Sequence, residues 1–249
     1  MNALIFAAGL GTRLKPLTDT MPKAMVPVNG KPLVQILIEK LKSIGVTEIV
    51  INVHHFARQI IDFVEANDHF GIDIKFSDET DMLLETGGGL KKAARLFSND
   101  KPILVHNVDI LSNADLLSLY NGATSTTLLV SQRDTQRYLL FDDTNRLVGW
   151  TNIATGEIKS PYPDIKALEN NYQLSIINCQ FNTLAYSGIQ VFHPSLLPLM
   201  DSWQGKFSII DFYLSICDKV EIKCQFDPHL QLLDVGKLDT IAKAEAFLR

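Results

Sequence analysis

The chain has 249 residues, 46% of them hydrophobic, which is enough to bury the core of one large α/β domain or of one domain with a small appendage. With 28 acidic and 23 basic side chains the formal net charge is -5, which argues against a general nucleic-acid binder. Any anionic ligand must therefore be bound by a local cluster of cations.

The apolar run 3–8 is far shorter than the roughly 20 residues that span a bilayer, so we expect a buried strand there and no membrane partner. The three cysteines, Cys179, Cys217 and Cys224, form neither a CxxC pair nor a metal-binding spacing. They predict buried reduced thiols, which favours a cytoplasmic protein.

Apolar runs of strand length alternate with helical patterns through the first half of the chain. The predicted strands are 3–8, 48–53, 72–77, 102–109 and 125–131, and the predicted helices are 32–44, 57–67, 88–96 and 113–120. This alternation, with continuously apolar strands, predicts an α/β, Rossmann-like fold whose mostly parallel central sheet carries helices on both faces.

From about Tyr138 the pattern changes to short strands and turns, which predicts a small β-meander in place of another βα unit. The stretch from Pro161 to Asn171 is predicted to be a loop, because it holds two prolines and several polar residues. The remaining predicted elements are a strand at 184–192, helices after Pro194 and at 209–216, a strand at 220–226 and a last helix at 238–247.

The glycine-rich turn after the first strand fits neither of two common phosphate-binding motifs. A dinucleotide fingerprint requires a third glycine where Leu14 stands, and no acidic residue closes the strand 48–53. A P-loop has the pattern G-x-x-x-x-G-K-[ST], whereas Gly11 is followed here by Thr12 and Arg13. Both interpretations are therefore rejected.

The turn nevertheless has the composition of a polyphosphate-binding loop. Gly9 and Gly11 free backbone N–H groups, Thr12 adds a hydroxyl and Arg13 a forked cation. Lys23 follows ten residues later in a proline-rich, extended segment. Together the two cations can surround a polyphosphate; the alternative is a tight turn with both cations in solvent.

The segment "AAGLGTRLKPLTDTMPKAMVPVNGKPL" closely resembles the signature of the sugar-phosphate nucleotidyltransferases, also called nucleoside-diphosphate-sugar pyrophosphorylases. The matching positions are Gly9, Gly11, Thr12, Arg13, Leu17, Thr18, Pro22 and Lys23. The resemblance extends from residue 3 to about 246 and is densest in the first 110 residues. It implies one nucleotidyltransferase domain over 1–249, with a nucleotide-binding half (1–131) and a sugar-binding half with the C-terminal helix (132–249).

Two aspartates are candidate magnesium ligands. Asp109 closes the strand 102–109 and Asp234 ends another apolar run, with Gly236 allowing a sharp turn after it. Either could instead be a helix cap or a turn residue. The resemblance implies that both bind the metal that neutralises and aligns the phosphates, although Val108 stands where the family usually has glycine.

The stretch "LLETGGGLKKA" places three glycines before a predicted helix, where they permit close approach by a flat ligand or form a flexible loop. The resemblance puts this stretch beside the nucleobase, so Ala8, Glu85, Thr86 and Gly88 join the loop residues as predicted nucleotide contacts. The form E-T-G-G-G is similar to bacterial uridylyltransferases that activate N-acetylmuramate 1-phosphate during cell-wall recycling. Guanine would suit the same acceptors, so the base stays open.

The resemblance implies that Ser187 and Gly188, in "AYSGIQVFHP", lie beneath the sugar, unless the glycine only marks a bulge in an ordinary strand. Many relatives carry an E-K-P motif on the meander, whereas this chain has Trp150 and Asn152 there. Asn152 is a predicted sugar-phosphate contact, and Lys206 is a candidate for the missing phosphate contact or a solvated surface lysine.

These residues lead to one hypothesis. A sugar 1-phosphate attacks the α-phosphorus of a nucleoside triphosphate, giving a nucleotide sugar and pyrophosphate. Gly11–Arg13 hold the leaving phosphates and Lys23 stabilises charge at the α-phosphate, while Asp109 and Asp234 hold Mg²⁺. Arg13, Lys23 and Asp109 are the predicted catalytic residues.

Three alternatives are weighed against uridylyl transfer to N-acetylmuramate 1-phosphate. A GTP-dependent mannose- or heptose-1-phosphate guanylyltransferase is the nearest, and a non-catalytic nucleotide-sugar-binding protein is the alternative from another class. A nicotinamide-dependent oxidoreductase lacks its third glycine and its ribose-binding acid. The sequence does not indicate an oligomeric state.

Overall fold

The computed structural model describes residues 1–171, 177 and 180–248. Within these residues ten strands form one central sheet. Its strands are β1 (Asn2–Phe6), β4 (Glu48–Val53), β5 (Asp73–Asp78), β6 (Ile103–Asn107), β8 (Thr126–Ser131), β9 (Arg137–Phe141), β10 (Leu147–Asn152), β11 (Glu157–Lys159), β12 (Asn182–Phe192) and β13 (Ile222–Phe226). Two short pairs lie beside it: β2 (Pro27–Val28) with β3 (Lys31–Pro32), and β7 (Ile110–Ser112) with β14 (Leu232–Asp234).

The middle of the sheet is parallel. β6, β1, β4 and β5 are neighbours in that order and run in the same direction. All six residues of β4 are buried, which explains why four of them are apolar. The two polar exceptions are Glu48 and Asn52. The prediction of a Rossmann-like α/β fold with mostly parallel central strands is confirmed.

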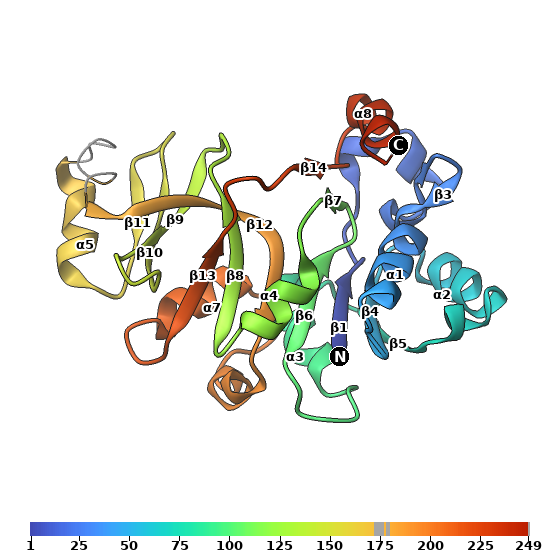
Figure 1. Ribbon diagram of the computed structural model, residues 1–249, viewed down its shortest axis with the longest axis horizontal. Helices are drawn as coiled ribbons and strands as arrows, with labels where there is room; N and C mark the ends of the chain where they lie inside the picture. The colour runs from blue at the N-terminus through green and yellow to red at the C-terminus, as the bar shows by residue number, and fades with distance from the viewer. Residues whose placement is uncertain (172–176, 178–179, 249) are drawn as a thin grey trace.

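The second half of the chain extends this sheet with antiparallel strands. β12 pairs antiparallel with β6, β8 and β9, and the meander β9–β10–β11 continues outward from it. β13 pairs in parallel with β8. The boundary expected at residue 131 therefore divides the chain within a continuous sheet, and the meander forms one end of the molecule (Figure 1).

Helices cover both faces of the parallel strands, as expected. The helices are α1 (Leu33–Ser43), α2 (Ala57–Ala66), α3 (Glu85–Ala94), α4 (Leu116–Gly122), α5 (Pro163–Ala167), α7 (Ile209–Ile216) and α8 (Ile241–Phe247). Because side chains alternate along a strand, Ala3 and Ile5 of β1 belong to a core with α1 and α2, whereas Leu4 belongs to a core with α3 and α7. Figure 1 shows α1 and α2 at the end of the molecule away from the meander.

The stretch predicted to be a loop from Pro161 to Asn171 contains helix α5 and a 3₁₀ helix, Leu168–Asn171, so that prediction is wrong. Proline suits the first turn of a helix, where its missing N–H costs nothing, and Pro163 occupies that position. Ile165 supplies the buried contact that holds the helix on the sheet. The segment after Pro194 is a 3₁₀ helix, Pro194–Met200.

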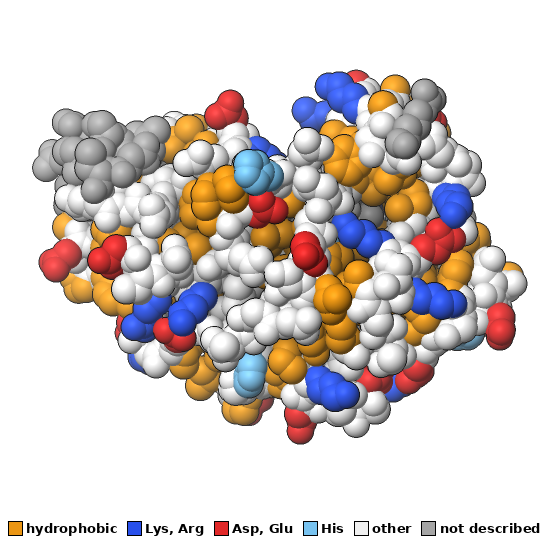
Figure 2. All heavy atoms as spheres, in the orientation of Figure 1, with side chains coloured by type: hydrophobic (Ala, Val, Ile, Leu, Met, Phe, Trp, Pro, Cys, Tyr) orange, Lys and Arg blue, Asp and Glu red, His pale blue; other side chains and the backbone are white. Residues whose placement is uncertain are grey.

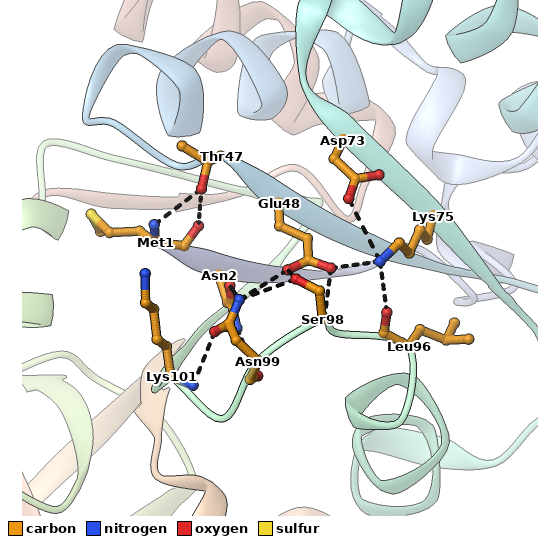
Figure 3. Close-up of polar contacts among 10 residues, drawn as sticks. All are labelled: Met1, Asn2, Thr47, Glu48, Asp73, Lys75, Leu96, Ser98, Asn99 and Lys101. Carbon is orange, nitrogen blue, oxygen red and sulfur yellow. Dashed lines mark hydrogen bonds and ion pairs between the residues drawn. The ribbon is translucent and has the colours of Figure 1, made fainter.

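A polar network ties the sheet together at the amino ends of its parallel strands (Figure 3). Buried Glu48 accepts from Lys75 Nζ at 2.6 Å and from the backbone and hydroxyl of Ser98 at 2.9 and 2.8 Å. Burial opposes ionisation of Glu48, yet these donors hold its pKa below the usual value. Both carboxylate oxygens of Glu48 have hydrogen-bond donors, so we assign this network a structural role. It lies at the amino ends of the parallel strands, opposite their carboxyl ends.

The cysteines are consistent with reduced thiols. Cys217 and Cys224 are buried and unbridged, and burial raises the pKa of each thiol to about 12. Cys179 lies outside the described residues. In the described part of the chain, no helix has both the length and the apolar character needed to cross a membrane.

The surface gives no sign of an extended basic patch on the face drawn in Figure 2. Lysine, arginine and acidic side chains are interspersed there among hydrophobic and other side chains. This distribution agrees with the formal charge of -5.

Candidate active site

A cavity of about 360 Å³ opens at the carboxyl ends of the parallel strands, where open α/β sheets bind ligands. We call it the strand-end cavity; Ala8, Lys23, Asn52, Glu79, Thr86 and Asp109 are among the residues that line it. It thus unites predicted residues from the glycine-rich turn, from α3 and from the end of β6. Asp109 lies two residues beyond β6, in the turn between β6 and β7, and not within the strand as predicted.

The glycine-rich turn folds tightly against the lysine segment. Gly11 has φ +63°, and a Cβ there would lie 2.9 Å from Thr18 Cγ2 and 3.1 Å from Lys23 Cβ, so only glycine fits without a shift. The Thr18 hydroxyl donates to the Gly11 carbonyl at 2.8 Å. Thr12 and Arg13 follow on a short 3₁₀ helix and are exposed, whereas Gly9 lines the cavity.

Four charged groups gather at the cavity's mouth. Lys23, only 8% exposed, forms an ion pair with Asp109, and its Nζ lies 4.0 Å from Asp234 Oδ1. Arg13 Nη2 lies 3.6 Å from Asp234 Oδ2. The predicted catalytic and metal residues therefore form one cluster, with the lysine between the two carboxylates.

The two aspartates, 125 positions apart in the sequence, meet because the chain returns to pair with β7. β14 runs antiparallel to β7, with Asp234 opposite Ile110, and the Val235 N–H donates to the Asp109 carbonyl at 2.8 Å. Neither short strand is predicted from the sequence, since three residues carry too little periodicity. This pairing is what places Asp234 beside the end of β6.

The donor set at this cluster fits a divalent cation that keeps substrate and water oxygens. Asp234 Oδ1 is buried without a hydrogen-bond partner, and a Cβ at Gly236 would lie 2.5 Å from it and 2.7 Å from Arg13 Nη2. Among the described residues no group of three or more histidine, cysteine, aspartate or glutamate side chains could hold a metal. Two carboxylates are the small protein contribution that Mg²⁺ usually receives at phosphate sites.

Two further polar residues of the cavity wall are absent from the sequence predictions. Asn52 Oδ1 accepts from the Ala7 and Ala8 N–H groups at 2.6 and 3.2 Å, and Asn52 Nδ2 donates to Glu79 Oε1 at 2.8 Å. Glu79 Oε2 accepts from the Leu84 N–H at 2.9 Å. The only signal in the sequence is an amide within an apolar strand. Ala8, a predicted nucleotide contact, lines the cavity, and its N–H donates to Asn52 Oδ1.

The three glycines lie inside α3, not before it, and they accommodate protein atoms. A Cβ at Gly87 would collide with the Phe207 ring and approach the Phe207 carbonyl to 2.9 Å, and one at Gly88 would collide with the Gly205 carbonyl. The structure shows close packing instead of an opening for a flat ligand: Gly87 and Gly88 pack against 205–207, and Gly89 packs against Glu79 and Asn52. Glu85 and Thr86 line the strand-end cavity, whereas Gly88 does not.

A second cavity, of about 590 Å³, lies over the meander, and we call it the meander cavity. Its wall contains two rows of side chains from neighbouring strands. Arg137, Asn152 and Glu157 are paired across β9, β10 and β11, and Leu139, Trp150 and Lys159 form the next row on the same face. The wall thus combines an aromatic surface with a polar, charged edge.

The charges of the meander cavity are unevenly paired. Lys159 pairs with Asp211 at 3.1 Å and lies 5.2 Å from the Trp150 ring centroid. Arg133 Nη2 donates to the Tyr186 carbonyl at 3.2 Å. In the described part of the chain neither Arg133 nor Arg137 has an acidic side chain within ion-pair distance. Burial raises the pKa of Tyr186, so its phenol stays protonated.

The predicted sugar-phosphate residues are only partly brought together. Asn152 lines the meander cavity. Ser187 is 2% exposed and its hydroxyl donates to the Leu129 carbonyl at 2.7 Å, while Gly188 has φ +81° at an irregularity in β12. This geometry favours the bulge interpretation, and neither residue lines the strand-end cavity or the meander cavity. Lys206 is exposed and pairs with Glu85 at 3.2 Å.

The two cavities adjoin, since Glu85 and Ser208 line both. Apart from Ser208, the described residues that line the strand-end cavity fall between 6 and 109, and apart from Glu85 those that line the meander cavity fall between 133 and 214. The two cavities therefore share the part of their walls that Glu85 and Ser208 form.

Comparison with known proteins gives the context for this arrangement. N-acetylmuramate alpha-1-phosphate uridylyltransferase of Neisseria meningitidis is 42% identical over 125 residues, 50% of this chain and 54% of that protein. The protein of the same name from Caulobacter vibrioides is 28% identical over 251 residues, 99% of this chain and 96% of that one. D-glycero-alpha-D-manno-heptose 1-phosphate guanylyltransferase of Campylobacter jejuni is 34% identical over 139 residues, 55% of this chain and 61% of that one. The Neisseria and Campylobacter matches thus span less than two thirds of those relatives' lengths.

Solved structures share the fold over the whole chain. A putative glucose-1-phosphate thymidylyltransferase from Bacillus anthracis has a TM-score of 0.76 at 18% identity. The match covers 100% of this chain and 95% of that one. HddC from Yersinia pseudotuberculosis, complexed with GMP-PN, has a TM-score of 0.73 at 23% identity, covering 100% of this chain and 99% of that one. The family model described as "Nucleotidyl transferase" matches residues 2–138, more than half of the chain. The chain therefore belongs to the nucleotidyl transferase family.

Proposed function

We propose that the protein is a magnesium-dependent sugar-1-phosphate nucleotidyltransferase that joins a nucleoside triphosphate and a sugar 1-phosphate and releases pyrophosphate. The observation that carries this proposal is the cluster of Lys23, Asp109 and Asp234 where the strand-end cavity opens, with the meander cavity adjoining it. In-line displacement at phosphorus needs the triphosphate and the sugar 1-phosphate held side by side among cations. In this proposal the strand-end cavity holds the triphosphate and the meander cavity holds the sugar 1-phosphate.

The triphosphate occupies the strand-end cavity in this proposal, with Glu85 and Thr86 near the base. The exposed backbone and side chains of Gly11–Arg13 hold the leaving phosphates. Lys23 stabilises charge at the α-phosphate once it leaves Asp109. Mg²⁺, held by Asp109 and Asp234, would screen the phosphates and align the attacking oxygen. The acceptor oxygen is already anionic at neutral pH, so no general base or covalent intermediate is required.

The acceptor occupies the meander cavity, so that residues 1–131 bind mainly the nucleotide and residues 132–249 the sugar. Trp150 offers an aromatic surface to a sugar ring, and Asn152 and Glu157 can bond its hydroxyls. Arg133 and Arg137 add guanidinium groups without acidic partners, which favours an acceptor with a second anion. N-acetylmuramate 1-phosphate carries a carboxylate and is the acceptor that the two uridylyltransferase relatives are named for, so we propose it with UTP, in the cytoplasm.

A guanylyltransferase acting on a heptose or mannose 1-phosphate is the second candidate, because the Campylobacter relative is 34% identical to this chain. The test is a matrix of UTP, GTP, CTP, ATP and thymidine triphosphate against sugar 1-phosphates, including N-acetylmuramate 1-phosphate, with pyrophosphate release as the readout. Release that depends on both substrates and is abolished by a chelator supports the proposal. No release with any pair, together with tight nucleotide-sugar binding, would favour a non-catalytic binding protein.

A further inference from the structure

One acidic residue in the wall of the strand-end cavity has no role in the reaction as proposed. Glu79 is 1% exposed, and it lies in a cavity that we assign to a polyanion. A buried carboxylate is costly unless donors surround it, and it repels phosphates. Its role therefore depends on which hydrogen bonds the two oxygens of Glu79 accept, since two accepting oxygens are what a carboxylate offers and an amide does not.

Glu79, together with the Ala7–Ala8 backbone, fixes which way the Asn52 amide points. Asn52 is 3% exposed and has one accepting and one donating end. Glu79 Oε1 accepts from Asn52 Nδ2 at 2.8 Å, so the donating end of the amide faces Glu79. The amide oxygen then faces the Ala7 and Ala8 N–H groups at 2.6 and 3.2 Å. The opposite orientation would place donor against donor at Ala7 and acceptor against acceptor at Glu79.

The same carboxylate also holds the other wall of the cavity. Its second oxygen accepts from the Leu84 N–H at 2.9 Å, at the residue before α3. Gly89 leaves room for the pair, because a Cβ there would lie 2.8 Å from Glu79 Oε1 and 3.1 Å from Asn52 Nδ2. One buried carboxylate thus connects the start of the glycine-rich turn to the start of the base-side helix.

We propose that Glu79 and Asn52 are positioning residues for the nucleotide: the carboxylate sets the amide orientation, and the amide holds the Ala7–Ala8 backbone from which the phosphate-binding turn begins. The kinetic part of this inference rests on the proposed function. The pair acts only on the nucleotide side, since neither residue lines the meander cavity.

The critical experiment exchanges the two functional groups. Glu79→Gln leaves one accepting oxygen for two donors, and Asn52→Asp sets two carboxylates against each other. We expect each to raise the KM for the triphosphate about tenfold, with the KM for the sugar 1-phosphate unchanged. In Asn52→Asp/Glu79→Gln the carboxylate at position 52 accepts from Ala7 and Ala8, while the amide at position 79 donates to it and accepts from Leu84. This double variant should recover most of the lost affinity.

Glu65→Gln, an exposed change on α2, is the matched control and should leave both KM values unchanged. A double variant no better than the worse single variant, or equal effects on both substrates, would overturn the inference. The backbone amide resonances of Ala7 and Ala8 give a readout without turnover: they should shift in the single variants and return in the double variant. If the wild type shows no turnover, the proposed function fails while these resonances still test the pair. If the single variants do not fold, rapid hydrogen exchange at both amides in the wild type would contradict the inference.

Discussion

Lys23 is the residue on which the proposed chemistry depends most. It is buried between two carboxylates, and in the proposed mechanism its ammonium stabilises the charge that develops at the α-phosphate. We expect Lys23→Ala to lower kcat about a hundredfold or more, as loss of other charge-stabilising donors does, with the fold retained. Pyrophosphate release at saturating substrates measures this. Lys31→Ala removes an exposed lysine paired with Glu39 and should have little effect; near-native turnover in Lys23→Ala would rule out the assigned role.

Gly236 is a residue whose lack of a side chain shapes the proposed metal site. A Cβ there would press on Asp234 Oδ1 and Arg13 Nη2, so Gly236→Ala must displace one of them. Since a shift of about 1 Å in a positioned group can cost roughly a hundredfold, we expect a clear fall in kcat/KM and a higher Mg²⁺ requirement. Gly122→Ala, where a Cβ meets nothing nearer than 3.9 Å, is the control. An unchanged Mg²⁺ dependence in Gly236→Ala would argue against metal binding by Asp234.

At this scale the sequence indicates the charged residues better than the residues that position them. Arg13, Lys23, Asp109 and Asp234 belong to a recognisable motif or to strand ends, and the structure gathers all four. Asn52 and Glu79 could not be found, because a polar residue next to apolar strands has many explanations until its partners are known. Ser187 was expected at the sugar, but its hydroxyl donates to the Leu129 carbonyl of the neighbouring strand β8.

Among the elements, α3 depends on glycines that would weaken an isolated helix. Alanine at a helical glycine normally adds up to about 1 kcal/mol of stability. Gly87→Ala should instead lower the free energy of unfolding by about 1–3 kcal/mol, because the new methyl group overpacks against Phe207. Urea denaturation measures the change, with Gly122→Ala, at the end of α4 where a Cβ has room, expected to be neutral or stabilising. A stabilised Gly87→Ala would mean that 205–207 moves aside at no cost.

The meander supplies the test of acceptor charge. If Arg133 and Arg137 bind a second anion of the sugar, Arg137→Ala should raise the KM for N-acetylmuramate 1-phosphate about tenfold, the scale of a lost charged hydrogen bond. The KM for a neutral hexose 1-phosphate and for the triphosphate should stay the same. Arg58→Ala, an exposed arginine paired with Asp62, is the control. Equal losses for acidic and neutral sugars would assign Arg137 to the phosphate group instead.

Element prediction succeeds where hydrophobic periodicity is long and fails where it is short. Strands such as β4 and helices such as α2 follow the expected ranges within a few residues. β7 and β14 have three residues each and exist because they pair with one another across the chain, which no local pattern encodes. Helix α5 was not predicted because its segment contains prolines. Pro163, however, stands in the first turn, where proline is favourable in a helix.

For the whole molecule, one buried histidine should dominate acid sensitivity. Burial in β6 lowers the pKa of His106 to about 4, whereas the unfolded imidazole titrates near 6.5. Between these values the unfolded chain binds the proton and the folded chain does not, so the free energy of unfolding falls as pH drops, by about 3 kcal/mol in total. Denaturant titrations between pH 7 and 4 measure this slope. His106→Gln should flatten it, and an identical slope in both proteins would contradict the assignment.

Glu85 connects the two cavities of the molecule. It stands in the wall of both cavities, pairs with Lys206 and adopts φ +58°, a conformation uncommon for a residue with a side chain. Any movement of Glu85 when one cavity fills changes the shape and charge of the other. If a nucleotide and an acceptor fill the two cavities as proposed, their binding equilibria are thermodynamically linked. The factor by which the nucleotide alters acceptor affinity must then equal the factor by which the acceptor alters nucleotide affinity.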